Sequence, residues 1–499
     1  MSNPSKTFTQ QLKLQNTFAG LGDDFYQKKS PDPVTDPYLI HFNPSVSQLI
    51  DLNISSESES EFTSIFSGNH PLPQAFPLAM VYSGHQFGVY NPRLGDGRGL
   101  LLSEAHATDG SVWDIYLKGC GPTRFARGFD GRATLRSSIR EYLAGEAMHS
   151  LGIPSTRAIA LIGIRDLIFR DRPELAAVLV RFSDSHIRFG SFEQPHYSNH
   201  PEKIPKLLDY AIQRHFPDIN DSADKYRLFF REVVQRTAVL IAHWQTVGFV
   251  HGVMNTDNML ITGATFDYGP FGFLDRFNPG FTANSSDTSG RYAWSKQPQI
   301  GHWNLGKLGE TLVSICGASA LEAELNEYQP IYNQTFRALM GKKLGLDLLD
   351  EEFSNLVGRL FQILSENPAD FTNFFRGLSN FPEGYCDSLY NYFPDKKVLD
   401  DWLSLYRRLL DREDQDNDLR ARKMNRANPK FILRNHLLEH AISKAMKESD
   451  HSEIDRLFAF AQSPFDELPE CLAKDNFDSQ FYYADTPQKF IDWRLSCSA

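Results

Sequence analysis

The chain has 499 residues, of which 41% are hydrophobic and 13% aromatic, so it can bury a sizeable core and is not a disordered protein. Its 62 acidic and 51 basic side chains give a formal charge of −11. Because general nucleic-acid binders need a basic surface to neutralise phosphates, this balance predicts no nucleic-acid partner. At roughly 150 residues per domain, the length predicts about three domains or one large catalytic fold with additional segments.

The five cysteines are widely spaced and include no Cys-x-x-Cys pair, which argues against a disulfide framework and against a structural zinc site. The residues after Met1 show no basic segment followed by an apolar run, so no signal peptide is expected. No stretch of about 20 apolar residues is present, so no membrane partner is expected either. The expected location is the cytoplasm.

Residues 1–75 are interpreted as an N-terminal extension and residues 76–200 as a strand-rich unit. One helix interrupts this unit from about Thr134 to Leu151, where apolar side chains recur at helical spacing. Short apolar runs broken by glycine predict its strands: Leu100–Leu102, Trp113–Leu117, Ala158–Ile162 and Ala177–Val180.

After residue 200 the pattern changes to long amphipathic helices, and the clearest runs from about Ser222, a suitable N-cap, to Val247. We divide this part into residues 201–345 and a helical C-terminal region of residues 346–499. The whole pattern predicts an α+β protein of two lobes with a cleft between them. The N-lobe is strand-rich with one key helix, and the C-lobe is helical.

The first candidate for chemistry is the run Leu94-Gly95-Asp96-Gly97-Arg98, which leads directly into a predicted strand. Glycines allow a backbone to turn tightly and to approach phosphate oxygens, and Arg98 would add a charged fork. A glycine-rich hairpin turn is the simpler explanation of the same residues, so a phosphate loop is one of two interpretations.

Lys118 ends the predicted strand Trp113–Leu117. A strand lysine that reaches a nucleotide phosphate and pairs with a helix glutamate is a feature of protein kinases. The following helix offers Glu141 and Glu146 for that pairing, and Glu141 lies off the apolar stripe. A surface lysine and a surface glutamate are the alternative.

Arginines are dense around these elements for an acidic chain. Five of them lie between residues 124 and 140, on both sides of Asp130-Gly131. Arg181 and Arg188 follow the last predicted strand of this unit, seven residues apart. A pocket for a polyanion explains these arginines, and so do a solvated helix face and ordinary surface charges.

The strongest signal is the run His251–Asn258, followed by Asp267-Tyr268-Gly269. A kinase catalytic loop places a metal-binding asparagine five residues after its catalytic aspartate, and a metal-binding Asp-Phe-Gly further on. Asn258 and Asp267 keep both metal positions, and their amide and carboxylate oxygens suit Mg²⁺. The apolar Val253 replaces the catalytic aspartate.

Asp257 is the carboxylate that remains on this loop beside the metal position. Without an aspartate at position 253, transfer of a γ-phosphoryl group should be poor, because that residue orients the acceptor hydroxyl. The shifted carboxylate predicts that the reacting phosphorus is shifted too. A nucleotide bound the other way round would place its α-phosphorus at the metal site.

Longer stretches carry a family resemblance: Ser83–Gly88, Leu94–Arg98, Leu117–Gly119, Gly131–Ala133, Leu135–Glu141, His251–Met259, Phe266–Pro270 and Trp303–Leu305. Over nearly its whole length the chain resembles the selenoprotein O family of pseudokinase-like protein adenylyltransferases. The resemblance implies a protein-kinase-like fold that binds ATP in a flipped orientation. It also implies transfer of AMP to Ser, Thr or Tyr hydroxyls of protein substrates.

The resemblance further implies a role for each matching residue. Asp257 is the implied proton acceptor, and Asn258 and Asp267 are the implied ligands of Mg²⁺, with Mn²⁺ as a possible substitute. The residues implied to bind ATP are Gly95, Gly97, Arg98, Lys118, Asp130, Gly131, Glu141, Arg181, Arg188 and Asp267. Cys497 matches the family's C-terminal selenocysteine or cysteine position. Residues 281–292 contain no cysteine, which argues against the disulfide that some members form with this tail.

Two other functions stay open at the level of the sequence. A phosphotransferase would use the same parts, although Val253 counts against it. A catalytically inactive nucleotide-binding scaffold would need neither Lys118 nor the metal ligands, so their retention counts against it.

Overall fold

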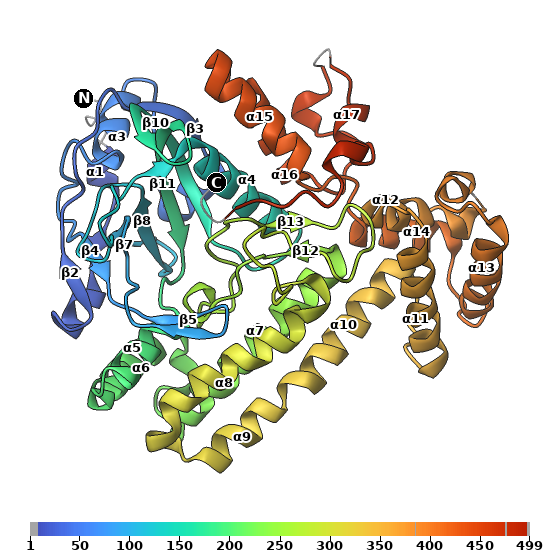
Figure 1. Ribbon diagram of the computed structural model, residues 1–499, viewed down its shortest axis with the longest axis horizontal. Helices are drawn as coiled ribbons and strands as arrows, with labels where there is room; N and C mark the ends of the chain where they lie inside the picture. The colour runs from blue at the N-terminus through green and yellow to red at the C-terminus, as the bar shows by residue number, and fades with distance from the viewer. Residues whose placement is uncertain (1–7, 385, 475–476, 497–499) are drawn as a thin grey trace, which may run out of the picture.

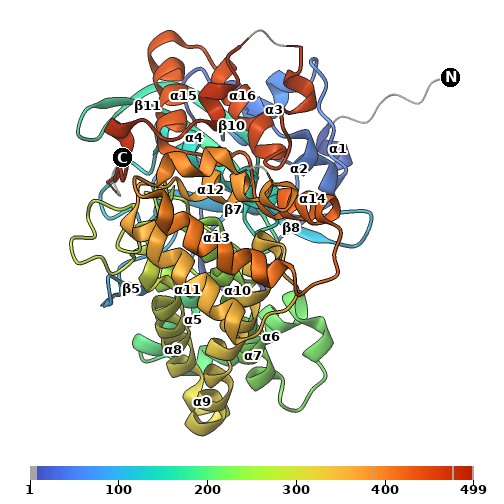
Figure 2. The same cartoon turned by 90° about the vertical axis from the view of Figure 1, so that its right-hand side faces the viewer.

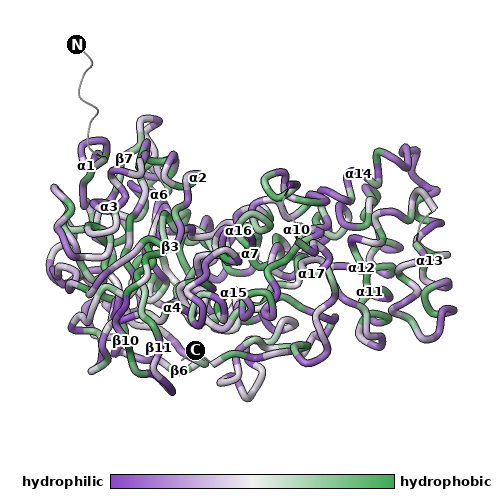
Figure 3. The backbone as a smooth tube through the Cα atoms, turned by 90° about the horizontal axis from the view of Figure 1, so that it is seen from above, coloured by the Kyte–Doolittle hydropathy of each residue, from purple (hydrophilic) through white to green (hydrophobic). Residues whose placement is uncertain are grey.

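The computed structural model describes residues 8–384, 386–474 and 477–496. The protein is a mixed α/β structure with one large antiparallel sheet and many helices (Figure 1). Seen from above, the sheet lies at one end of an elongated molecule and a group of helices from the C-terminal region lies at the other (Figure 3). The α+β class expected from the sequence is therefore present.

Within the described residues the large sheet has nine strands, in the order β2-β4-β7-β8-β11-β10-β3, with β1 paired to β7 and β9 paired to β11. Its strands are β1 Leu14–Gln15, β2 Tyr26–Lys28, β3 Tyr38–Phe42, β4 Leu78–Met80, β7 Gly99–His106, β8 Val112–Lys118, β9 Ala133–Thr134, β10 Arg157–Phe169 and β11 Pro173–Ser183. Each of the four strands expected from the sequence lies within one of these. Two two-stranded sheets lie outside it: the hairpin of β5 Gly84–Gln86 with β6 Val89–Asn91, and β12 Phe249–Val250 paired with β13 Gly272–Phe273.

Residues 1–75 contribute β1, β2 and β3 to this sheet. The sequence predicts no strand there, because runs of two to five residues are too short to show a periodic pattern. The same segment supplies helices α2 Pro44–Ser47 and α3 Glu59–Phe66, whose apolar side chains pack against one face of the sheet.

Helix α4, Leu135–Ser150, covers the other face of the sheet. Thr134 is its N-cap and accepts a hydrogen bond from the backbone nitrogen of Ser137, as a threonine at this position commonly does. Leu135, Ile139 and Leu143 are fully buried against the strands. The helix is therefore held firmly, and its remaining side chains have fixed positions beside the sheet.

Helix α7, Lys225–Val247, starts two residues later than an N-cap at Ser222 predicts. Asp224, not Ser222, is the residue before its first turn, and the Ser222 hydroxyl accepts a hydrogen bond from the Asp224 backbone nitrogen. The N-cap assignment was wrong because the serine closes the preceding turn instead, a common alternative for serine side chains.

Helices make up most of the chain after residue 185 (Figures 1 and 2). Helices α15 and α16 of the C-terminal region pack against α4, far back in the sequence (Figure 1). The helix bounds are α5 Phe189–Tyr197, α6 Ile204–His215, α8 Gln297–Cys316, α9 Ala318–Asn326, α10 Tyr328–Leu344, α11 Glu351–Glu366, α12 Phe371–Leu378, α13 Lys396–Leu410, α14 Asn417–Ala427, α15 Asn435–Glu448, α16 Ser452–Gln462 and α17 Gln480–Tyr483, besides the N-terminal α1 Phe8–Gln11. None of the helices in the described residues combines the length and apolar character needed to cross a bilayer.

Candidate active site

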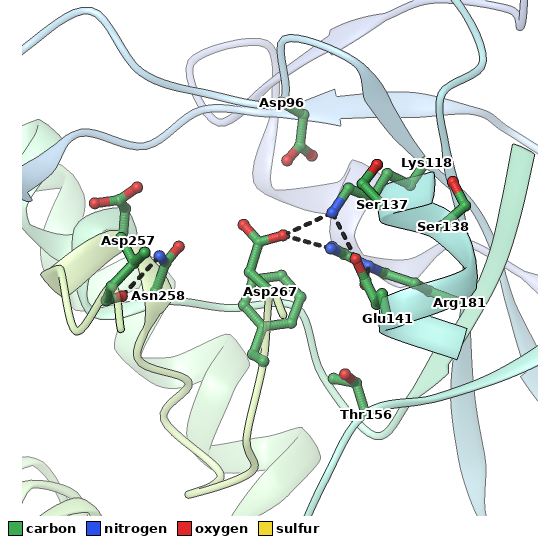
Figure 4. A network of polar contacts seen from close by, with 12 residues as sticks. Asp96, Lys118, Ser137, Ser138, Glu141, Thr156, Arg181, Asp257, Asn258 and Asp267 are labelled. Carbon is green, nitrogen blue, oxygen red and sulfur yellow. Dashed lines mark hydrogen bonds and ion pairs between the residues drawn. The ribbon is translucent and has the colours of Figure 1, made fainter. Parts of the chain in front are cut away.

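Four charged residues from four elements meet between the sheet and the loops that follow α7 (Figure 4). The Nζ atom of Lys118, the last residue of β8, lies 2.5 Å from Oε2 of Glu141 on α4 and 3.1 Å from Oδ1 of Asp267. Arg181 on β11 also pairs with Glu141, and its Nη2 lies 2.5 Å from the same Asp267 oxygen. Two basic and two acidic side chains thus form one closed network.

The lysine pairs with Glu141 rather than Glu146. Glu146 lies further along α4 and binds Arg157 instead, at 2.8 Å. Because α4 buries its apolar stripe on the sheet, Glu141 is the glutamate that faces the network.

Burial sets the electrostatics of this network. The side chains of Lys118, Glu141 and Arg181 are 8%, 4% and 2% exposed. Burial alone would raise the pKa of Asp267, but the surrounding Lys118 and Arg181 hold that pKa well below its usual value, so the carboxylate is ionised. Burial also lowers the pKa of the Lys118 ammonium, against the opposing charge of Glu141.

Asp267 adopts a left-handed backbone conformation with φ of 57°, which aspartate tolerates better than most residues. His251 connects its loop to the preceding loop. The His251 Nδ1 accepts a hydrogen bond from the Val253 backbone nitrogen, which leaves Nε2 to donate to the carbonyl of Phe266 at 2.8 Å. Burial lowers the pKa of His251, in keeping with this neutral form.

Asp257 and Asn258 lie together in a short 3-10 turn, Thr256–Asn258. The Asn258 amide nitrogen donates to the Val253 carbonyl at 3.0 Å, which leaves its Oδ1 as the free end of the amide. Asp257 is 7% exposed, and its Oδ1 has no hydrogen-bond partner among the described residues. Burial raises the pKa of Asp257 to about 7, a shift that nearby Arg188 opposes.

The β5–β6 hairpin fastens this turn from the other side. The backbone nitrogen of His85 donates to Thr256 Oγ1 at 2.7 Å, and Nε2 of Gln86 donates to Asp257 Oδ2 at 3.3 Å. A Cβ on Gly84 would lie 3.0 Å from Asp257 Oδ1, so a larger residue here would push the Asp257 side chain by a few tenths of an ångström. These contacts are not predictable from the residues alone; the one available signal was that the string Ser83–Gly88 belongs to the family resemblance.

Arg188 links the same turn to the glycine loop and to Asp267. Its Nη1 donates to the backbone oxygen of Asp257 at 3.0 Å and lies 3.7 Å from Asp267 Oδ2. Its Nη2 lies 3.4 Å from Oδ1 of Asp96, a buried residue that the sequence interpretation passed over although it lies between Gly95 and Gly97. The guanidinium stacks over the ring of Tyr82, 4.2 Å from its centroid.

The glycine loop packs against Phe125. Gly95 has a φ of 114°, and a Cβ there would lie 2.5 Å from the Phe125 ring, while a Cβ on Gly97 would lie 2.8 Å from the Phe125 carbonyl. A cavity of about 510 Å³ adjoins the loop, and its wall includes Tyr82, Leu94 and Phe125. Arg98 is exposed, and its charge contributes to the low pKa of Asp267.

Asp130 and Gly131 are not joined to the charged network by any contact in the described residues. The Asp130 carboxylate instead binds Arg170 of the β10–β11 turn through two hydrogen bonds of 2.7 and 2.9 Å. Gly131 has a φ of 68°, and a Cβ there would lie 2.1 Å from the backbone nitrogen of Pro122. The glycine is therefore needed for the close packing of its own loop.

The donor atoms fit a hard divalent cation. Asn258 Oδ1 and Asp267 Oδ2 are the oxygen types that Mg²⁺ prefers. No group of three or more His, Cys, Asp or Glu in the described part of the chain could hold a metal ion by itself. Mg²⁺ normally completes its shell with water and substrate phosphates, so two protein ligands suffice. Cys497 lies outside the described residues.

Comparison with known proteins identifies the family. Residues 8–462 match the model of the family described as "Protein adenylyltransferase SelO". Proteins named "Protein nucleotidyltransferase YdiU" from Myxococcus xanthus and Thioalkalivibrio sulfidiphilus are 46% and 43% identical to the chain, each over 98% of it and 99% of the relative. The relative of that name from Pseudomonas aeruginosa strain UCBPP-PA14 is 44% identical over 92% of this chain and 94% of its own. The resemblance drawn from the motifs is thus confirmed, and the chain belongs to the protein adenylyltransferase SelO family.

Proposed function

We propose that this protein transfers AMP from ATP to hydroxyl groups of protein substrates, in a kinase-like cleft between two lobes. Membership of the family makes it a nucleotidyltransferase. The observation that carries the finer proposal is the placement of Asp257. This buried carboxylate lies next to the Asn258 ligand position, whereas Val253 occupies the place of a kinase base. We assign residues 76–200 with β1 to β3 to the N-lobe and residues 201–345 to the C-lobe.

The charge distribution supports a flipped nucleotide. Lys118 and Arg181 lie deep in the site, where they would neutralise the outer phosphates. Arg188 lies between them and Asp257, and its stacking partner Tyr82 also forms the wall of the cavity beside the glycine loop. A nucleoside in that cavity would direct its triphosphate past Arg188 towards Lys118. Its α-phosphorus would then be the one nearest to Asp257.

Asn258 and Asp267 would hold Mg²⁺, or Mn²⁺ in its place. When bound, the ion supplies positive charge that stabilises a pentavalent phosphorus and the departing pyrophosphate. Glu141 contributes by holding Lys118 and Arg181 in place, so that Asp267 keeps one carboxylate oxygen for the ion. Asp130 and Gly131 are proposed nucleotide contacts on the strength of the resemblance alone.

Asp257 is proposed to handle the proton. The acceptor hydroxyl attacks the α-phosphorus, the bond to pyrophosphate breaks, and Asp257 accepts the hydroxyl proton. A carboxylate whose pKa burial raises to about 7 is a far better base than an ordinary aspartate. Its Oδ1 is buried beside Gly84 and lacks a hydrogen-bond partner among the described residues, and we assign the proton to this oxygen. We expect the reaction to take place in the cytoplasm.

The position of the label tests the proposal. Purified protein is incubated with ATP labelled at either the α or the γ phosphate, with a cell lysate as the source of substrates. Label from the α position alone, together with an AMP mass increment on Ser, Thr or Tyr, is expected. Asp257→Asn, which keeps the size and the hydrogen bond from Gln86, should lose transfer but still bind ATP. Incorporation of γ label would instead identify a phosphotransferase, and ATP binding without either label a scaffold.

A further inference from the structure

A second cavity, of about 490 Å³, lies where the C-terminal ends of α7, α10 and α14 meet, and no residue of the charged network lines it. The ends of α10 and α14 lie side by side in this part of the molecule (Figure 1). Its volume is within the range of small-molecule sites. We call it the basic cavity, because its wall includes Lys342, Lys343, Lys423 and Arg426.

None of these four cations has an ion pair or a side-chain hydrogen bond with any residue that the structure describes. Neighbouring cations do have partners: Arg420 on α14 pairs with Glu413, and Lys430, three residues beyond the end of α14, pairs with Glu467. In a chain with a net charge of −11, four unpaired cations around one cavity are a local excess.

The surroundings only partly balance this excess. Helix C-termini carry about half a negative charge each, which lets lysines gather in their last turns. Asp347, the one acidic residue in the wall, and the three helix ends do not balance four cations. The charge of Lys342 also lowers the pKa of nearby His243, in addition to the effect of burial. A positive potential therefore remains in the cavity.

Among the four cations of the basic cavity, Lys343 gives the strongest evidence for a bound anion. It is 4% exposed, and its ammonium lies 4.3 Å from the ring centroid of Phe375. Burial lowers its pKa to about 7, with no carboxylate to oppose the shift. A buried lysine without a counter-ion destabilises a fold, so its presence here calls for a compensating role.

The rest of the wall is largely apolar, with Leu151, Val247, Leu339, Leu346 and Phe465 among its residues. We propose that the basic cavity binds a small organic anion with an apolar body and a carboxylate or phosphate head. The apolar side chains would receive the body, and the lysines and Arg426 the head.

Isothermal titration of the whole protein with octanoate, octyl phosphate and octanol tests this site. Both anions are expected to bind, and the neutral alcohol about tenfold or more weakly, the factor expected from one hydrogen bond between charged groups. The ratio of the two anion affinities identifies the preferred head group. Equal binding of octanol, or no binding of either anion, would overturn the proposal.

Substitutions in the cavity wall test whether the anions bind in the basic cavity. Lys423→Glu combined with Arg426→Glu should abolish anion binding, whereas Arg422→Glu, an exposed position of α14 outside the cavity wall, should not. Lys343→Met should weaken binding of the anion and at the same time raise the melting temperature of the ligand-free protein. If the variant that carries both Lys423→Glu and Arg426→Glu binds the anions as tightly as the Arg422→Glu variant does, the anions bind elsewhere and the assignment is wrong.

Discussion

Gln86 donates a hydrogen bond to the carboxylate of Asp257 although 171 residues separate them in the chain. The Gln86 amide is itself held by Asn91, whose Nδ2 donates to Gln86 Oε1 at 3.0 Å. The β5–β6 hairpin thus fixes one oxygen of Asp257, and the other has no hydrogen-bond partner among the described residues. Gln86 is a positioning residue in this arrangement, since it acts through Asp257.

Gln86→Leu should therefore reduce turnover without weakening nucleotide binding. Loss of one hydrogen bond to a charged group predicts a decrease in kcat of roughly tenfold or more, with the KM for ATP unchanged. Steady-state AMP transfer measures both constants. Val89→Ala, at a 71% exposed position of the same hairpin, is the control and should behave as wild type. A rise in KM with unchanged kcat would contradict the positioning role.

Glu141 holds two buried cations at once, so its loss should be costly for the fold. Glu141→Gln leaves Lys118 and Arg181 with Asp267 as their remaining carboxylate, and removal of one partner from a buried ion pair typically costs about 3–5 kcal/mol. Urea unfolding should show this decrease in the free energy of unfolding. Glu310→Gln breaks the half-exposed pair with Lys307 and should cost about 1 kcal/mol or less. Equal losses in the two variants would show that the buried network contributes little.

A residue of this site can be predicted from the sequence when its neighbours in the chain are enough to identify it. Lys118, Asn258 and Asp267 are recognisable because kinase-like chemistry fixes their spacing within short runs of sequence. Helical periodicity places Glu141 off the buried stripe but leaves Glu146 as an alternative, and the family resemblance supplies the choice between them. In each case the neighbouring residues in the chain define the structural context.

The contacts of the site that cannot be predicted from the sequence are those that depend on long-range packing. Asp96 faces Arg188 only because the glycine loop folds back onto Met80, to which Asp96 is hydrogen-bonded, and Gln86 reaches Asp257 only through the hairpin. The orientation of Asp130 towards Arg170 depends in the same way on a distant strand turn. Periodicity and spacing do not contain this information, because they describe elements rather than how the elements meet.

Asp267→Asn should separate catalysis from stability. Glu141 still pairs with Lys118 and Arg181 in this variant, so the network keeps its main carboxylate and the fold should survive. Loss of the anionic metal ligand should reduce AMP transfer on the order of a thousandfold, because a bound metal ion contributes several kcal/mol to transition-state stabilisation. Transfer assays over a series of Mg²⁺ concentrations, with thermal unfolding as the control, measure the two effects. Wild-type transfer in this variant would exclude Asp267 as a metal ligand.

His41 on β3 makes the stability of the protein sensitive to acid. Its Nδ1 lies 2.6 Å from the Tyr142 hydroxyl of α4, and its ring packs on Phe458 of α16. Burial lowers the pKa of His41 to about 4, against an opposing effect of Glu146. Between pH 6.5 and 4 the unfolded chain therefore binds a proton that the folded protein does not, so stability falls as the pH falls. The loss from this group amounts to at most about 3 kcal/mol.

His41→Gln removes the titrating ring but keeps a side chain that can bond to Tyr142. The variant should be less stable than wild type at pH 7, because it loses the contact with Phe458, yet it should lose less further stability between pH 6.5 and 4.5. Urea unfolding at a series of pH values measures the two slopes, and the difference between them isolates His41 from the carboxylates that titrate in the same range. His200→Gln, at an exposed position, should keep the wild-type slope. Identical slopes for His41→Gln and wild type would mean that folding leaves the pKa of His41 unchanged, with Asp455, 3.6 Å from its Nε2, offsetting the effect of burial.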